Sequence, residues 1–265
     1  MRWVIGDIHG MLAPLEGLVR AIDQVDKDRQ LMFAGDYVNR GPDAKGVIDF
    51  LMSLPQAHFV RGNHDDVFDE VVSGLSYCSK PDVDVRVASF QWFMQHGLSN
   101  TFLSYGVRAP RLAEILQRPS VAALNELAQF IPQPHRNFIR NLPVVLETPD
   151  MFVAHAKWDV QMPTQSPPMR RRLESEELTR YNLLWGRYMA QEIDVEKAWE
   201  RTGYFGHTPV DNYRDDKELL PLMGSKIVLV DIAVALVAHG RLTAVCHETG
   251  AFLQTDVAGK LVQPP

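Results

Sequence analysis

Five short apolar runs in this sequence each end at a cluster of polar and glycine residues. The clusters are Gly6-Asp7-Ile8-His9-Gly10, Gly35-Asp36, Gly62-Asn63-His64-Asp65, His155 and Gly206-His207-Thr208-Pro209. Short apolar runs bounded in this way are typical of buried strands. A lone Asp-x-His is an ordinary loop sequence, but five clusters in the same position relative to a strand are not expected by chance. The pattern therefore predicts one site assembled from five strand ends.

The clusters combine carboxylates, one amide and several imidazoles. The candidate metal ligands are Asp7, His9, Asp36, Asn63, His155 and His207. Hard oxygen ligands mixed with imidazole nitrogens suit two divalent cations that share a bridging ligand and keep positions open for water and substrate. Residues two apart on an extended segment project to the same side, so Asp7 and His9 are expected to bind one ion. This donor set predicts a two-metal hydrolase that acts on phosphoesters.

The predicted strands alternate with helices. Residues 4–5, 31–33, 58–60, 151–153 and 204–205 are the expected strands before the clusters, and apolar residues recur at helical spacing after the first two clusters. This alternation predicts a layered α/β fold in which the ligands converge on one sheet edge. Residues 226–230, 241–246 and 251–257 predict a second, largely antiparallel sheet.

Length and composition favour one domain over residues 1–265, because 265 residues with 46% hydrophobic content can bury a substantial core. A mainly helical insert is expected at about 68–143, including helices over 111–131 and 134–142. The insert carries none of the candidate ligands, and its role is either substrate selection or packing.

Several sequence features exclude other classes of protein. Met1-Arg2-Trp3 runs directly into a predicted strand, and no apolar stretch is long enough to span a bilayer, so a cytoplasmic protein with no membrane partner is expected. Cys78 and Cys246 are far apart, which indicates neither a disulfide framework nor a thiolate metal site. The net charge of −6 argues against a nucleic-acid partner.

The clusters resemble those of the calcineurin-like metallophosphoesterases, and within them the branch of bacterial-type Ser/Thr protein phosphatases and symmetrical diadenosine tetraphosphatases. The resemblance covers nearly the whole chain. Its most specific segments are Gly6–Gly10, Gly35–Pro42, Arg61–Asp65, the His155 segment and Gly206–Val210. It implies a two-sheet β-sandwich flanked by helices, with a helical cap insert.

The resemblance also implies residue roles. Asp7 and His9 would bind the first metal ion, Asp36 would bridge both ions, and Asn63, His155 and His207 would complete the second site. His64 would be the general acid toward the leaving oxygen. Arg40 and Arg187 would bind the phosphoryl oxygens, a task suited to a planar guanidinium, although Arg187 could instead form a surface salt bridge.

Two positions depart from the protein phosphatase pattern. Asn39 stands where those enzymes carry an Asp that orients the catalytic His, and an amide cannot stabilise an imidazolium by charge. Asp65 replaces the usual Glu of Gly-Asn-His-Glu, and this shorter carboxylate is more similar to the dinucleotide hydrolases and to other bacterial-type branches. In contrast, the segment Gly97–Thr101 and Leu184-Trp185 resemble bacterial proteins described as Ser/Thr phosphatases.

The expected activity is direct hydrolysis by water that two cations activate, with no protein nucleophile. The first expectation is a phosphomonoesterase that acts on a phosphorylated protein or a small phosphoester, and the alternative is a dinucleoside polyphosphate hydrolase. A binding module that has lost catalysis and a nuclease are further, less favoured readings. Manganese is the expected metal, with iron or zinc as alternatives.

Overall fold

Eleven short strands form two sheets in the described part of the chain, which is residues 1–265 without 79–81, 159–176, 195–199, 215, 217 and 263–265 of the computed structural model. The six-stranded sheet has the order β11-β10-β9-β1-β2-β3 and the five-stranded sheet the order β4-β5-β6-β8-β7. The strands of the first are β1 (Arg2–Ile5), β2 (Gln30–Phe33), β3 (Ala57–Phe59), β9 (Leu242–Cys246), β10 (Phe252–Thr255) and β11 (Leu261–Val262). Those of the second are β4 (Val145–Glu147), β5 (Met151–Ala154), β6 (Thr202–Phe205), β7 (Leu222–Met223) and β8 (Ile227–Leu229).

The two sheets pack face to face because their central strands are apolar on both sides. Alternate residues, such as Val4, Val153 and Val228, join one buried cluster between the sheets. Their neighbours Ile5 and Phe152 point the opposite way, toward helices on the outer faces. This arrangement confirms the predicted α/β sandwich.

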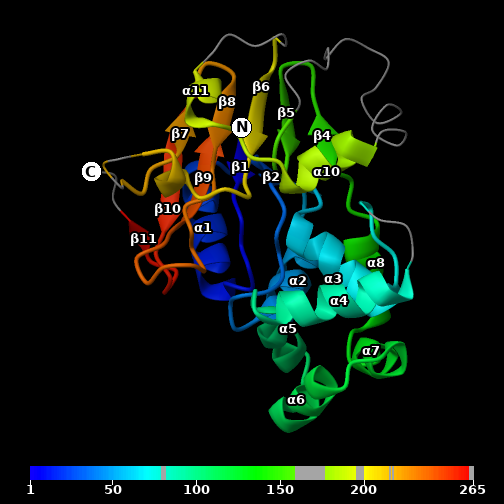
Figure 1. The fold of residues 1–265 in the computed structure, drawn as a ribbon. Coiled ribbons are helices and arrows are strands. Elements are labelled where there is room, and N and C mark those ends of the chain that lie inside the picture. Colours follow the sequence, from blue (N-terminus) through cyan, green and yellow to red (C-terminus); the bar gives the residue numbers. More distant parts are fainter. Residues whose placement is uncertain (79–81, 159–176, 195–199, 215, 217, 263–265) are drawn as a thin grey trace.

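Helices cover both outer faces of the sandwich (Figure 1). Helices α1 (Leu12–Val25) and α2 (Ala44–Ser53) pack on the six-stranded sheet, and α10 (Glu177–Trp185) and α11 (Ala190–Ile193) on the five-stranded sheet. The helices in and around the predicted insert gather beside the sandwich, with α6 and α7 farthest from it. They are α3 (Asn63–Ser73), α4 (Val83–Met94), α5 (Leu98–Ser104), α6 (Ala109–Gln117), α7 (Val121–Ala128) and α8 (Gln133–Arg140); a 3₁₀ turn, η1 (Val210–Asn212), follows β6.

Two predicted elements differ from the structure. The segment 111–131 forms two helices because Pro119 disfavours helical backbone at Arg118, and Ser120 then caps α7 by accepting from Ala123 N. The three C-terminal strands do not form a sheet of their own. Instead β9 pairs with β1 and with β10, whereas β8 pairs with β6.

The prediction of a single sheet edge was also wrong, because the strands before the ligand clusters divide between the two sheets. Strands β1, β2 and β3 run parallel in one sheet, and β5, β6 and β8 run parallel in the other. Their carboxyl ends meet at the same end of the sandwich, so both sheets contribute to the site. Within the described residues, no helix is both long and apolar enough to span a membrane.

Candidate metal centre

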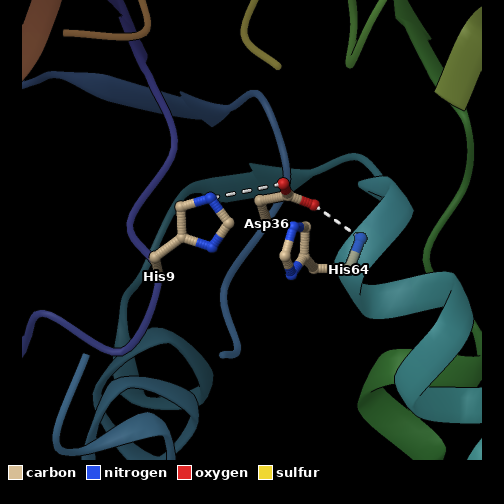
Figure 2. A group of neighbouring side chains, drawn as sticks. All are labelled: His9, Asp36 and His64. Atoms are coloured by element: carbon tan, nitrogen blue, oxygen red, sulfur yellow. Dashed lines mark hydrogen bonds and ion pairs between the residues drawn. The ribbon is translucent and has the colours of Figure 1, made fainter. Parts of the chain in front are cut away.

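Asp36 lies between His9 and His64 (Figure 2). Its Oδ2 atom is 3.5 Å from Nε2 of His9 and 3.5 Å from Nε2 of His155, and Asp7 Oδ2 is 3.8 Å from the same nitrogen of His9. Two buried groups of potential ligands, His9-Asp36-His64 and Asp7-Asp36-His155, therefore share this carboxylate. The arrangement fits a dinuclear metal site with Asp36 between the two ions.

Backbone carbonyl groups fix which nitrogen of each buried imidazole faces the site. Nδ1 of His9 lies 3.0 Å from Val38 O, and Nδ1 of His155 lies 2.8 Å from Ala34 O. A carbonyl oxygen can only accept, so each Nδ1 donates and each Nε2 presents a lone pair. This is the orientation that metal-binding histidines require from their neighbours.

The amide oxygen of Asn63 joins the remaining ligands. Asn63 Oδ1 is 2.9 Å from Nε2 of His155 and 3.1 Å from Nδ1 of His207. Because Nε2 of His155 carries a lone pair, two electron-pair donors face each other there, which a cation between them would stabilise. The structure thus brings all six predicted ligands together, and their chemistry fits bound divalent metal ions.

Left-handed backbone turns aim the ligands into the site. His9, Asp36 and His207 have φ values of 48°, 57° and 66°, a region that residues other than glycine rarely adopt. The expectation that Asp7 and His9 project from an extended segment is therefore incorrect in detail, since β1 ends at Ile5 and the chain turns at His9. Gly62 permits a close approach, because a Cβ there would lie 2.1 Å from Asp36 Oδ1.

Asp65 supports the backbone turn at Asp36. Its carboxylate accepts hydrogen bonds of 2.9 Å from the backbone N–H groups of Asp36, Tyr37 and Gly62. The side chain is fully buried at 0% exposure and lies in the first turn of α3. Asp65 therefore positions the Asp36 backbone and does not face the ligands.

Burial and mutual repulsion disfavour the charged forms of these groups. Desolvation, with the nearby charges of Asp231 and Asp36, raises the pKa of Asp7 well above its ordinary value, and desolvation with repulsion from Asp65 does the same to Asp36. Burial lowers the pKa of His155 to about 3. Divalent cations would reverse the penalty on the carboxylates, because they favour the ionised form.

His64 lies next to a ligand but at the start of a helix, since both Asn63 and His64 belong to α3. The Thr101 hydroxyl donates to Asn39 Oδ1, which turns Asn39 Nδ2 toward Nδ1 of His64 at 2.8 Å. Arg40 Nη2 lies 3.2 Å from Nε2 of the same ring. Burial, the neighbouring His9 and Arg40 lower the pKa of His64 well below 6.5.

The two predicted arginines line a pocket of about 300 Å³ together with Asp36, Asn63 and His207. Arg40 Nη1 lies 2.8 Å from His9 Nε2, and Arg187 Nη1 donates to Thr208 Oγ1 at 3.1 Å. The Arg40 backbone N–H donates to Gly97 O at 3.1 Å, and the Asn100 amide donates to Arg40 O. The start of α5 therefore holds Arg40 in position.

One acidic residue at the site was not predicted. Asp231 follows β8 just as His155 follows β5 and His207 follows β6. It is buried at 3% exposure, and its Oδ2 atom has no hydrogen-bond partner. The sequence carries the signal, because the apolar run 227–230 also ends at this carboxylate.

The model for the family described as calcineurin-like phosphoesterase matches residues 2–211. A symmetrical bis(5'-nucleosyl)-tetraphosphatase of Legionella pneumophila (strain Lens) is 48% identical over 64 residues, which is 24% of this chain and 23% of that protein. A protein of the same name from Bordetella pertussis is 38% identical over 135 residues, which is 50% of this chain and 39% of that protein. The matched segments thus span less than half the length of these relatives.

A similarity of fold extends further than these segments. The crystal structure of a candidate diadenosine tetraphosphatase covers 96% of this chain and 92% of its own, with a TM-score of 0.56 and 23% identity. The family match runs from before Asp7 to beyond His207, so it includes every predicted ligand. Together with the clustered carboxylates and imidazoles, this match shows that the chain belongs to the calcineurin-like phosphoesterase family.

Proposed function

We propose that this chain hydrolyses dinucleoside tetraphosphates symmetrically, adding one water to the central P–O–P bridge and releasing two nucleoside diphosphates. The observation that carries the proposal is the similarity to the two symmetrical bis(5'-nucleosyl)-tetraphosphatases. The substrate first expected from the sequence was a phosphomonoester, and these relatives favour the alternative. Asp65 in place of Glu supports the same choice.

We assign Asp7, His9 and Asp36 to one metal ion and Asp36, Asn63, His155 and His207 to the other. Bound divalent cations, with manganese as our prediction, would supply Lewis-acid activation of water and neutralise phosphoryl charge. Arg40 and Arg187 would bind phosphoryl oxygens through their guanidinium groups. His64 would pass a proton to the leaving oxygen, and Asn39 would orient its ring.

The test compares products and substrates. Metal-stripped protein resupplied with manganese is given diadenosine tetraphosphate, a phosphothreonine peptide and p-nitrophenyl phosphate in parallel. The proposal expects the dinucleotide to be preferred and ADP to be its sole nucleotide product. Equal amounts of ATP and AMP would contradict symmetrical cleavage, and preference for the monoesters would restore the phosphomonoesterase reading, which the Gly97–Thr101 segment favours.

Replacing Asn39 with Asp should move the alkaline limb of the pH–rate profile to higher pH. A carboxylate accepts the Nδ1–H of a His64 imidazolium, whereas the amide presents a donor there. The folded-state pKa of His64 is lowered, so the protonated imidazolium is lost as pH rises toward neutral. An opposite charge in contact raises such a pKa by about one unit or more.

Turnover of a phosphothreonine peptide between pH 5 and 9 checks this shift, because its alkoxide leaving group needs a proton. Asn137→Asp, an exposed position on α8, introduces the same charge away from the site and should leave the profile unchanged. A limb at the wild-type pH in Asn39→Asp would refute the proposed contact with the proton donor.

Replacing Gly97 with Ala should displace Arg40 and reduce kcat/KM by roughly tenfold or more, since small misplacements of a binding group are costly. A Cβ at Gly97 would lie 2.3 Å from Arg40 N, and the φ of Gly97 is +86°. Gly106 is a matched control, because its φ is +91° and a Cβ there meets nothing within 4 Å. Steady-state kinetics and melting temperatures are measured for Gly97→Ala and Gly106→Ala. Both variants carry the backbone strain, but only Gly97→Ala carries the contact with Arg40. Equal kinetics of the two variants would contradict the proposed displacement of Arg40.

A further inference from the structure

We propose that three aromatic side chains beside the metal centre, Trp92, Tyr181 and Trp185, form a nucleobase-binding row. We refer to them as the aromatic row. The inference rests on the proposed function and adds a residue-level subsite for one base of the dinucleotide. Helix α4 contributes Trp92, and α10 contributes Tyr181 and Trp185.

The aromatic row lies in a pocket that three of the predicted metal ligands also line. All three side chains line the pocket that Asp36 and His207 also line. The ring centroid of Trp185 is 6.4 Å from that of His207. A nucleotide with a phosphate at the ligands could therefore place its base on the aromatic row within the same pocket.

The three rings are nearly parallel. The centroids of Tyr181 and Trp185 are 6.4 Å apart at an interplanar angle of 16°, and those of Trp185 and Trp92 are 6.1 Å apart at 25°. A nucleobase stacks on an aromatic face in the same parallel, offset way. A base can thus extend the row on an outer ring with little rearrangement.

Two of the rings are only half covered by the protein. Trp92 and Tyr181 each keep 53% of their surface exposed, whereas the adjacent Phe93 is buried at 1%. Large aromatic side chains that gather at the mouth of a polar pocket are typical of ligand sites. A purely structural contact between α4 and α10 would not require the outer ring faces of the row to be exposed in the pocket.

Along the pocket, positively charged groups and aromatic rings follow one another as the phosphates and the base do in a nucleotide. Arg40 and Arg187 supply fixed positive charge for the phosphates, and the aromatic row supplies flat apolar surface for a base. A phosphorylated peptide side chain would use the first part and leave the second exposed. The arrangement therefore selects a phosphate chain that ends in an aromatic base.

Binding to the manganese-loaded protein tests the row without requiring turnover. Isothermal titration calorimetry compares ADP with methyl diphosphate, which has the same phosphate groups and no base. Trp92→Ala should weaken ADP binding by about tenfold, as expected for the loss of one stacking partner, and change methyl diphosphate binding less than twofold. Trp92→Phe should restore most of the ADP affinity, and GDP should behave like ADP because stacking does not read the base edge.

Phe130→Ala is the matched control, since Phe130 is 41% exposed in the helical insert and does not line this pocket. It should leave both affinities unchanged. Equal loss of ADP and methyl diphosphate binding in Trp92→Ala would show that the row is structural, and no loss of ADP binding would also overturn the proposal.

The outcome is separable from that of the proposed function. If wild-type protein does not cleave diadenosine tetraphosphate but Trp92→Ala loses only ADP affinity, the proposed function fails and the base subsite stands. If the dinucleotide is cleaved and the two ligands respond alike, the function stands and the subsite fails. Where both hold, Trp92→Ala should raise KM for the dinucleotide about tenfold with little change in kcat.

Discussion

Replacing Asp36 with Asn should lower metal-dependent turnover by about a thousandfold. Metal ions supply several kcal/mol of transition-state stabilisation, and each 1.4 kcal/mol corresponds to a factor of ten in rate. Asp36 belongs to both groups of potential ligands, so a neutral amide at this position weakens both. Initial rates over a manganese titration measure the effect, and Asp23→Asn, at a half-exposed carboxylate on α1 that pairs with Arg29, is the control.

The same substitution should stabilise the protein when metal is removed with a chelator. The pKa of Asp36 is raised above its ordinary value of 3.8 in the folded state. Its stabilising contribution is therefore present below about pH 4 and is lost as pH rises through the folded pKa. At pH 7 the ionised carboxylate destabilises the metal-free fold, and Asn removes that charge while its Oδ1 can still accept from His64 N.

Melting temperatures at pH 7 with and without manganese check both statements. The expected pattern is a higher melting temperature than wild type in chelator and a smaller increase on adding manganese. A variant that folds, binds manganese like wild type and keeps its turnover would exclude Asp36 as the bridging ligand.

Replacing His64 with Ala should reduce hydrolysis of a phosphothreonine peptide by roughly 10²- to 10⁴-fold, the usual contribution of a general acid. The reduction for p-nitrophenyl phosphate should be much smaller, because p-nitrophenolate leaves without a proton. Turnover of both substrates at saturating manganese gives the comparison, and His239→Ala, at an exposed position, is the control.

This comparison also distinguishes two roles for His64. The ring lies close enough to His9 and Asp36 to be counted with them as a potential metal ligand. Loss of a ligand would lower the rates for both substrates equally and would raise the manganese concentration needed for half-maximal activity. That result would contradict the assignment of His64 as the proton donor.

The sequence identifies the side chains that gather at this site because each candidate ligand follows a local pattern. An apolar run followed by Asp7, Asp36, Asn63, His155 or His207 can be recognised without knowing which strands pair. Asp231 carries the same signal and was missed because its run lies among the C-terminal strands. The chemistry of the site thus depends mainly on short-range features of the chain.

The pairing of strands was not predictable in the same way. Strand β9 is apolar on both faces, with Leu242 and Ala244 on one side and Val245 on the other, so its periodicity does not say which sheet it joins. The aromatic row is also invisible locally, because Trp92 and Trp185 meet only through the packing of α4 near α10. Both features depend on contacts between residues far apart in the sequence.

The contact between α5 and the Arg40 backbone has a consequence for protein engineering. Chimaeras that exchange a whole insert between relatives would also exchange the support of Arg40, because Gly97, Asn100 and Thr101 hold the backbone or side chains of residues 39–40. Such hybrids should lose activity toward every substrate at once. A hybrid that exchanges only residues 83–92 would replace Trp92 and keep that support, which makes it the smaller and more informative transplant for changing substrate preference.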